Sequence, residues 1–246
     1  IEFKHVSFKY PGSDRYVFKD LNLTIDSGEE IAIVGENGAG KSTLIKLLCC
    51  FYYPDSGQIL IGGIDTRLLD LSNWYKHLAY LTQEFNNFGN MTLADNVTIG
   101  DPTKPINTAG VLSALKNADA KYKKKYKDGL STRMSQRYGG EEPSLGQWQK
   151  IAIARIFYRD SSVMILDEPT ASIDAVSEYK IFNELYRAIT GKTLIIVSHR
   201  FSTVRNAERI LVLDNGNVAE SGTHEELLEL DGLYSHSFRL QAKGYN

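Results

Sequence analysis

Hydrophobic and polar residues follow two different patterns along this chain. Over residues 1–10 and 17–25 apolar and polar side chains alternate, which is typical of half-buried antiparallel strands. Runs rich in branched apolar side chains are instead expected for strands buried on both faces of a parallel sheet. Four such runs follow, at Ile31–Val34, Leu78–Leu81, Val163–Leu166 and Leu194–Val197. The pattern therefore predicts an α/β fold with a parallel sheet and an antiparallel β-subdomain at its N-terminus.

Polar residues or glycine come just after each of the four apolar runs. Gly35 follows the first run, Gln83 the second, Asp167 with Glu168 the third, and His199 the fourth. In open parallel sheets ligands bind beyond the carboxyl ends of the strands. We therefore expect these polar groups to meet at one edge of the sheet.

The stretch from about residue 91 to residue 161 has helical spacing and few apolar runs. It is interpreted as a helical lobe inserted into a single domain that covers residues 1–246. The lobe carries a cluster of lysines, interpreted as a solvated helix face, with nucleic-acid or anionic-lipid contact as the alternative. The cluster comprises Lys121, Lys123, Lys124, Lys125 and Lys127. The tail predicts strands over 210–213 and 218–220, followed by a helix.

Composition narrows the class of protein. Hydrophobic residues make up 42% of the chain and charged residues 24%, as in globular proteins. The net charge of −2 gives no reason to expect a nucleic-acid partner. No run approaches the about 18 apolar residues of a membrane span, and no secretory leader opens the chain. Ile1 already lies in a strand-like pattern, so we expect a longer polypeptide before it. Cys49 and Cys50, adjacent in an apolar run, are expected to pack in the core, which fits a reducing cytosol.

The segment Gly35–Ser42 has the sequence GENGAGKS, which matches the phosphate-loop pattern G-x-x-x-x-G-K-[ST]. It lies between an expected strand and an expected helix over Thr43–Leu48. Glycines let the backbone N–H groups turn inward around phosphate oxygens, and the start of a helix adds positive potential. Lys41 is expected to reach the β- and γ-phosphates of a nucleotide, and Ser42 to supply an oxygen to Mg²⁺. The alternative is a glycine-rich turn with no ligand.

An acidic pair, Asp167 and Glu168, ends the apolar run at Val163–Leu166. Next to a phosphate loop, Asp167 is expected to hold Mg²⁺, directly or through water, and Glu168 to polarise the attacking water as a general base. The alternative is a strand that ends in two solvated acids.

Ser144 precedes a helical run and Gln147 lies three residues later, which is the spacing of a helix capping box. The capping box by itself explains both residue types. The alternative is a second anion-binding helix start directed at another phosphate.

Taken in order, these motifs resemble those of the ATPase domain of ABC transporters. Ser144–Gln147 is similar to the family signature, usually written L-S-G-G-Q, and Ala171–Asp174 resembles the D-loop that follows it. Ser198–Arg200 resembles the switch region. Gln83 falls at the position of the lid glutamine, and Tyr10 at the aromatic residue that stacks on adenine. Together these motifs cover nearly the whole chain.

The resemblance implies a P-loop NTPase core with an inserted helical subdomain, ATP and Mg²⁺ as ligands, and a set of site residues. ATP is then bound by Tyr10, by Gly35, Glu36, Asn37, Gly38, Ala39, Gly40, Lys41, Ser42 and Thr43, and by Ser144, Gly146 and Gln147. Mg²⁺ is held by Ser42, Gln83 and Asp167. Catalysis falls to Glu168, His199, Gln83 and Lys41, with His199 on the γ-phosphate. The alternatives are a packed or solvated histidine at 199 and an ordinary edge-strand aromatic at Tyr10.

Two further segments resemble the exporter branch of the family: Thr92–Val97, and the ending Gly222–Leu227. In that branch a transmembrane domain usually precedes the ATPase, so we expect one before Ile1. The signature departs from the usual pattern, because Pro143 and Leu145 stand where leucine and glycine are common.

The resemblance also implies how the domain works. Two copies, either identical or different, close head to tail, and each ATP lies between one copy's phosphate loop and the other copy's Ser144, Gly146 and Gln147. ATP binding closes the pair and hydrolysis opens it, which drives export from the cytoplasmic face of a membrane. Residues 134–142 replace the exporters' usual acidic-glycine segment that contacts membrane-domain loops. The alternatives are a soluble ABC-type ATPase acting on nucleic acid or ribosomes, and a nucleotide-gated module without hydrolysis.

Overall fold

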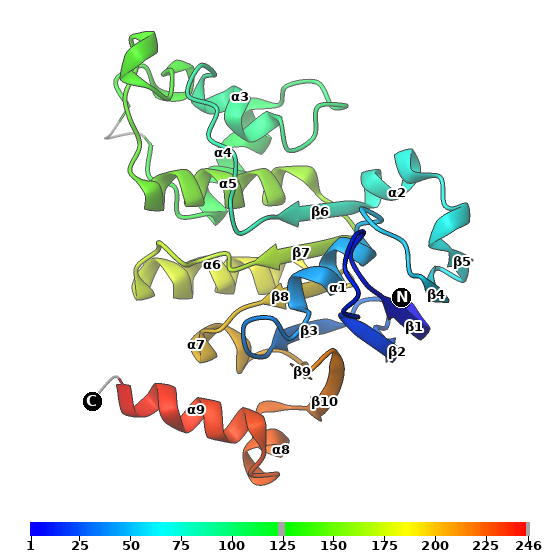
Figure 1. Ribbon diagram of the computed structural model, residues 1–246. Helices are drawn as coiled ribbons and strands as arrows, with labels where there is room; N and C mark the ends of the chain where they lie inside the picture. Colours follow the sequence, from blue (N-terminus) through cyan, green and yellow to red (C-terminus); the bar gives the residue numbers. More distant parts are fainter. Residues whose placement is uncertain (123–125, 245–246) are drawn as a thin grey trace. The chain divides into compact units, whose positions relative to one another are not determined.

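The computed structural model describes residues 1–122 and 126–244, and it divides into two compact units (Figure 1). The discontinuous unit consists of residues 1–77 and 191–246, and the continuous unit consists of residues 78–190. The expected single domain over 1–246 stays a prediction.

An antiparallel sheet opens the discontinuous unit. Its strands are β1 (Glu2–Phe8), β2 (Phe18–Thr24), β4 (Ser56–Ile61) and β5 (Ile64–Asp65), in the order β2-β1-β4-β5. Phe3, Val6 and Phe8 are buried along β1, which confirms the predicted half-buried antiparallel strand, although the alternation breaks between Phe3 and Val6, where the pairing with β2 shifts register. A 3₁₀ turn (Thr66–Leu68) and helix α2 (Leu71–His77) complete this part of the unit.

The second group of strands in the discontinuous unit leads into the phosphate loop and His199. It contains β3 (Glu30–Val34), β8 (Thr193–Val197), β9 (Arg209–Asp214) and β10 (Asn217–Gly222), in the order β10-β9-β3-β8. β3 runs parallel to both β8 and β9, while β9 and β10 are antiparallel. The helices of this part are α1 (Lys41–Leu48), α7 (Phe201–Val204), α8 (His224–Glu229) and α9 (Leu233–Gly244).

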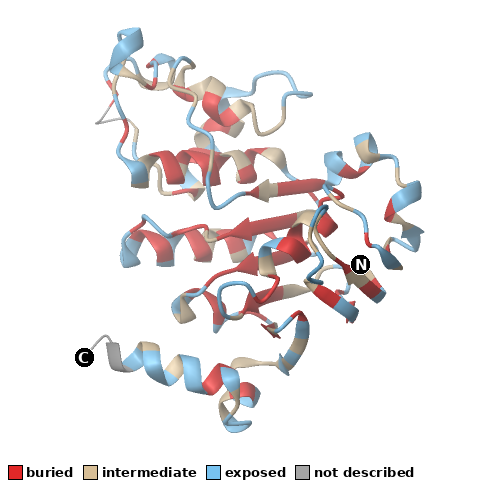
Figure 2. Ribbon diagram, viewed as in Figure 1, coloured by how far each residue is buried: buried red, intermediate tan, exposed pale blue. Residues whose placement is uncertain are grey.

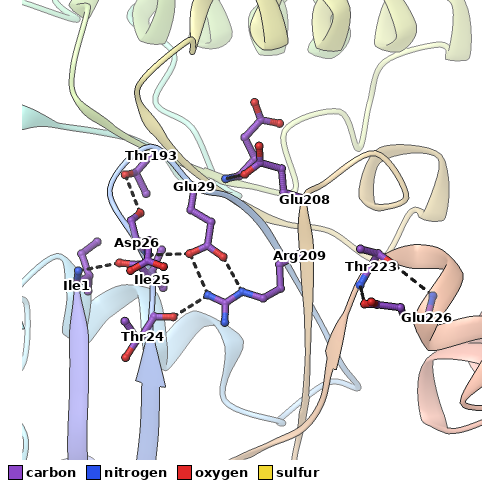
Figure 3. A network of polar contacts seen from close by, with 11 residues as sticks. Ile1, Thr24, Ile25, Asp26, Glu29, Thr193, Glu208, Arg209, Thr223 and Glu226 are labelled. Carbon is purple, nitrogen blue, oxygen red and sulfur yellow. Dashed lines mark hydrogen bonds and ion pairs between the residues drawn. The ribbon is translucent and has the colours of Figure 1, made fainter.

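A polar network fixes the start of β3 against β9 (Figure 3). The Arg209 guanidinium donates to both carboxylate oxygens of Glu29, at 2.6 and 3.0 Å, and to the Thr24 carbonyl oxygen at 2.7 Å. Bidentate pairing of this kind is geometrically specific as well as charge-assisted. Because Arg209 is also the register partner of Ile31, the network holds the strand that leads into the phosphate loop.

The continuous unit contains two parallel strands, β6 (Leu78–Leu81) and β7 (Val163–Asp167). Its helices are α3 (Leu93–Thr98), α4 (Thr108–Asn117), α5 (Leu145–Arg159) and α6 (Ala175–Ala188), with 3₁₀ turns at Gly129–Ser131 and Gln136–Tyr138. Within this unit α5 packs against α3 and α4 (Figure 1). Of the lysine cluster, residues 123–125 lie outside the described residues, and Lys121 and Lys127 are exposed.

Buried residues lie along the strands that carry the candidate site (Figure 2). All five residues of β8 are buried, as expected for a strand of a covered parallel sheet. The α/β prediction is thereby confirmed. Cys49 and Cys50 are buried, and burial raises the pKa of the Cys49 thiol to about 12 and that of Cys50 to about 11. Among the described residues, no helix combines the length and the apolar character that crossing a membrane requires.

Candidate functional site

The phosphate-loop segment connects the end of β3 to the start of α1, as predicted. Gly40 is the N-cap of α1 and has φ 110°, a conformation that residues with a side chain rarely adopt. A Cβ atom at this position would lie 2.8 and 2.9 Å from two ring carbons of Phe18. The sequence therefore needs glycine here for two reasons, the backbone angle and the close approach of the ring.

The amino end of α1 has the features of an anion site. Its N-cap, Gly40, has no side chain that competes for the first-turn N–H groups, and no acidic residue lies in that turn. The Lys41 ammonium donates to the carbonyl oxygens of Gly35, at 2.6 Å, and Glu36, at 2.9 Å. The side chain therefore lies folded over its own loop. A phosphate oxygen at the loop would give the same ammonium a charged acceptor in place of neutral ones.

Tyr10 lies against the first turn of α1. Its hydroxyl is 2.9 Å from Thr43 Oγ1, and its ring makes edge contacts with Phe8 and Tyr52. Beside it is an open cavity of about 580 Å³, whose aromatic lining also includes Phe51 and Tyr53. The cavity has room for a planar base next to the ring. Stacking of Tyr10 on adenine stays a prediction that this geometry permits.

His199 lies at the same sheet edge as the phosphate loop. Ile33 of β3 is the register partner of Val197 in β8, and Gly35 and His199 each lie two residues further along parallel strands. The His199 side chain is exposed, and its backbone carbonyl accepts a hydrogen bond of 2.7 Å from Gln241 Nε2 in α9. The phosphate loop with Lys41 and the residue His199, both predicted to contact the γ-phosphate, therefore lie at the same edge of the sheet.

The same arrangement recurs in the continuous unit. Leu81 of β6 pairs with Leu166 of β7, and Gln83 and Glu168 each follow two residues later. Asp167 is 6% exposed, and its carboxylate accepts a hydrogen bond of 3.5 Å from the Tyr80 hydroxyl. The two predicted magnesium ligands of this unit, Gln83 and Asp167, thus lie at neighbouring strand ends. Their carboxylate and amide oxygens fit the hard-cation chemistry of Mg²⁺.

Glu168 has a left-handed backbone, with φ 49°, at the end of β7. Such a conformation costs about 1–2 kcal/mol for a residue with a Cβ atom and is often found at active sites. The Glu168 carbonyl accepts a hydrogen bond of 3.3 Å from Gln149 Nε2, which comes from α5. Gln149 and Tyr80 did not emerge from sequence reasoning. The only available signal was a polar side chain at a position with apolar spacing.

The signature segment forms the start of α5. Ser144 is the N-cap, and Gln147 Oε1 accepts a hydrogen bond of 3.1 Å from the Ser144 N–H, the return bond of a capping box. Ser144 is exposed, and Leu145 is 60% exposed. A Cβ atom on Gly146 would lie 2.7 Å from the Ser172 carbonyl oxygen, so this glycine has a packing reason as well as the predicted phosphate contact.

Comparison with known proteins identifies the class that this fold and these motifs define. The family model described as "ABC transporter" matches residues 18–171, which is more than half of the chain. The chain belongs to the ABC transporter family. It is an ATPase domain of that family, and the predicted resemblance is confirmed.

Three of the similar proteins are named for flipping, translocation or export. The chain is 40% identical over 243 residues to the ATP-dependent lipid A-core flippase of Aromatoleum aromaticum, covering 98% of this chain and 40% of the relative. It is also 40% identical to the α-hemolysin translocation ATP-binding protein HlyB of Escherichia coli O157:H7, covering 34% of it. A bacterial Atm1-family ABC exporter with ATP bound superimposes with a TM-score of 0.89 at 34% identity, over 98% of this chain and 41% of that one. The chain thus spans about a third to two fifths of the length of these three proteins.

Proposed function

We propose that this ATPase domain powers the export of a substrate across a membrane, working as a head-to-tail dimer with two ATP molecules at the interface. The observation that carries the proposal is the amino end of α1. The N-cap there is glycine, and the first turn contains no acidic residue. The Lys41 ammonium donates to two carbonyl oxygens of the phosphate loop. Such an end favours the phosphates of a nucleotide through both its N–H groups and its dipole.

The residues divide the work of hydrolysis between them. Tyr10 stacks on the base and the loop Gly35–Thr43 binds the phosphates. Glu168 aligns and polarises the attacking water, while His199 contacts the γ-phosphate. Lys41 stabilises charge that develops on the transferred phosphoryl group. Positioning and charge stabilisation account for most of the catalysis in reactions of this kind.

Mg²⁺ is the cation that suits the donors proposed for it, the Ser42 hydroxyl, the Gln83 amide oxygen and the Asp167 carboxylate. When bound, Mg²⁺ would partly neutralise the charge on the phosphate oxygens. Asp167 is supported in this role by its burial and by the hydrogen bond from Tyr80, which together restrict its orientation.

The second copy contributes the signature. Ser144, Gly146 and Gln147 of one copy contact the ATP bound in the loop of the other. The exposure of Ser144 supports this proposal, because a partner's phosphate needs an accessible helix start. Either two identical chains or two different family members would satisfy the geometry.

The membrane part belongs to the proposal as well. Each relative described above is much longer than this chain, which suits a transmembrane domain before Ile1 and a position on the cytoplasmic face. A soluble ABC-type ATPase acting on nucleic acid or ribosomes is not favoured, since these relatives are named for flipping, translocation or export.

Substitution of the proposed general base tests the function. Glu168→Gln should keep ATP binding, slow hydrolysis by at least about 10²-fold and trap an ATP-bound dimer in Mg²⁺-ATP, detectable by size-exclusion chromatography. Glu208→Gln, the same change away from the site, serves as the matched control. Normal hydrolysis by Glu168→Gln would remove Glu168 from its role.

A further inference from the structure

Gln149 is a buried polar residue of α5, two positions beyond the signature segment. The residue is 2% exposed. Buried amides are retained where they satisfy other buried polar groups, so the partners of this side chain indicate its role.

Both ends of the Gln149 amide are used. Nε2 donates to the Glu168 carbonyl oxygen at 3.3 Å, and Oε1 accepts from the Ser172 N–H at 2.8 Å. One side chain thus bridges the first and last residues of the segment 168–172, which connects β7 to the D-loop. All three residues belong to the continuous unit.

The bridge acts on a backbone that is under strain. Glu168 has φ 49°, and its carbonyl also accepts a long bond of 3.4 Å from the Ala171 N–H. The φ and ψ angles of Glu168 set the direction in which its carboxylate leaves the strand. A group that holds this carbonyl therefore orients the carboxylate without touching the substrate.

A second, independent contact joins the same two segments. The Ser172 carbonyl approaches Gly146 so closely that a Cβ atom there would lie 2.7 Å from it. The start of α5 and the segment 168–172 are therefore in contact at Gly146 and bridged at Gln149.

We infer that Gln149 is a positioning residue for hydrolysis, which fixes the Glu168 backbone and the D-loop to the start of the signature helix. The inference rests on the proposed role of Glu168. It adds that the helix carrying Ser144 and the residue aligning the water are linked through one buried amide. A displacement of about 1 Å at a catalytic group can cost about 10²-fold in rate, so the loss of such a link should lower turnover.

Two substitutions test this role in the full chain. Gln149→Met keeps the length of the side chain but loses both hydrogen bonds, whereas Gln149→Glu keeps an acceptor for the Ser172 N–H. We expect kcat for ATP to fall at least about tenfold in both, with the nucleotide Kd within about twofold of wild type. Gln58→Met and Gln58→Glu, the same changes on an exposed residue of β4, should leave both constants unchanged. Rates are expressed per nucleotide-binding site counted by titration, so unfolded protein does not imitate the effect.

A double-mutant cycle separates positioning from simple packing. If Gln149 acts through Glu168, adding Gln149→Met to Glu168→Gln should produce no further fall in the residual rate. An equal fall in both backgrounds, or unchanged kcat in both single variants, would overturn the inference. Glu168→Gln alone reports on the proposed function, because normal turnover there disproves the role of Glu168 whatever Gln149 does.

Discussion

Helices α1 and α5 both begin at residues predicted to bind phosphate, but the two helix starts are built differently. The N-cap of α1 is Gly40, with φ 110° and no side chain, and the neighbouring Lys41 turns its ammonium onto the loop carbonyls. The N-cap of α5 is Ser144, in an extended conformation, and Gln147 returns a hydrogen bond to it.

The difference separates two ways of making an anion site. At α1 the N-cap is glycine, so no N-cap side chain competes with the proposed phosphate for the first-turn N–H groups. At α5 side chains already stabilise the helix start, so it holds its shape while the second copy is absent. The α1 start thus has no side-chain cap of its own, whereas the α5 start is capped by side chains of the same chain.

The largest effect should come from separating the two helix starts onto different copies. Lys41→Ala and Ser144→Arg should each lower ATP hydrolysis by at least about 10²-fold. Mixing the two proteins should return about a quarter of wild-type activity, because about half of the dimers are mixed and each holds one intact site. ATPase rates and nucleotide trapping on the mixture provide the measurement.

A mixture of Lys41→Ala and Ser42→Ala is the control for this experiment, since both changes damage the loop and no intact site can form. If Ser144 only caps its own helix, mixing Lys41→Ala with Ser144→Arg will restore neither turnover nor trapping, and the contrast between the two helix starts loses its functional meaning.

A backbone substitution at α1 should have the next largest effect. Gly40→Ala should lower the free energy of unfolding by about 1–3 kcal/mol, because φ 110° is strained for alanine and the new Cβ meets Phe18. Gly38→Ala is the matched control: φ is 87° there, but no atom lies within 4 Å of the added Cβ. Urea unfolding compares the two. Equal losses would show that the contact with Phe18 is unimportant.

Substitutions at Tyr10, which lies against the first turn of α1, test how nucleotide binds at this helix start. Tyr10→Ala should weaken ATP and GTP binding alike by about 1 kcal/mol, since stacking depends on the ring face and not on a hydrogen-bonding edge. Tyr10→Phe should bind almost as wild type, although it loses the 2.9 Å contact with Thr43. Calorimetric titration measures both. A phenylalanine variant as weak as the alanine variant would assign the effect to the hydroxyl instead.

The smallest effect should appear in the polar support of α5. Burial raises the pKa of Asp119, but hydrogen bonds from Lys150 of α5 and from Ser177 outweigh it, so the pKa lies below its usual 3.8. A lowered carboxyl pKa contributes stability above about pH 4 that is lost as the pH falls. Asp119→Asn should therefore be less stable than wild type at pH 6, by less than about 1 kcal/mol, and the gap should close toward pH 3. A gap that widens on acidification would contradict this assignment.

The parts predicted well from the sequence are those whose signal is local. The apolar run Ile31–Val34 lies in β3, and the run Val163–Leu166 lies in β7, as predicted. Strands buried on both faces need unbroken apolar residues, which makes them visible in the sequence. The glycine pattern around Lys41 located the phosphate loop. By contrast, β4 escaped prediction, since its partner β1 lies about fifty residues away and pairing leaves no local mark.

The site residues that sequence reasoning missed share one property. Gln149, Tyr80 and Gln241 each act through a hydrogen bond to a residue far along the chain, and for two of them the acceptor is a backbone carbonyl. A carbonyl is present at every position, so no residue type in the sequence reveals which one is used. Only the fold brings donor and acceptor together.

The position of β3 between β8 and β9 has a consequence for how the chain folds. The Gly28 N–H donates to Thr193 Oγ1 across 165 residues, and Arg209 pairs with Glu29 across 180. During synthesis, β3 therefore emerges long before either of its neighbours, with both edges unpaired. The strands that pair with β3, and so hold the phosphate loop after it, are synthesised only after the continuous unit. Such long-range pairing slows folding, and it leaves the apolar strand at residues 30–34 exposed to non-native pairing on a growing chain.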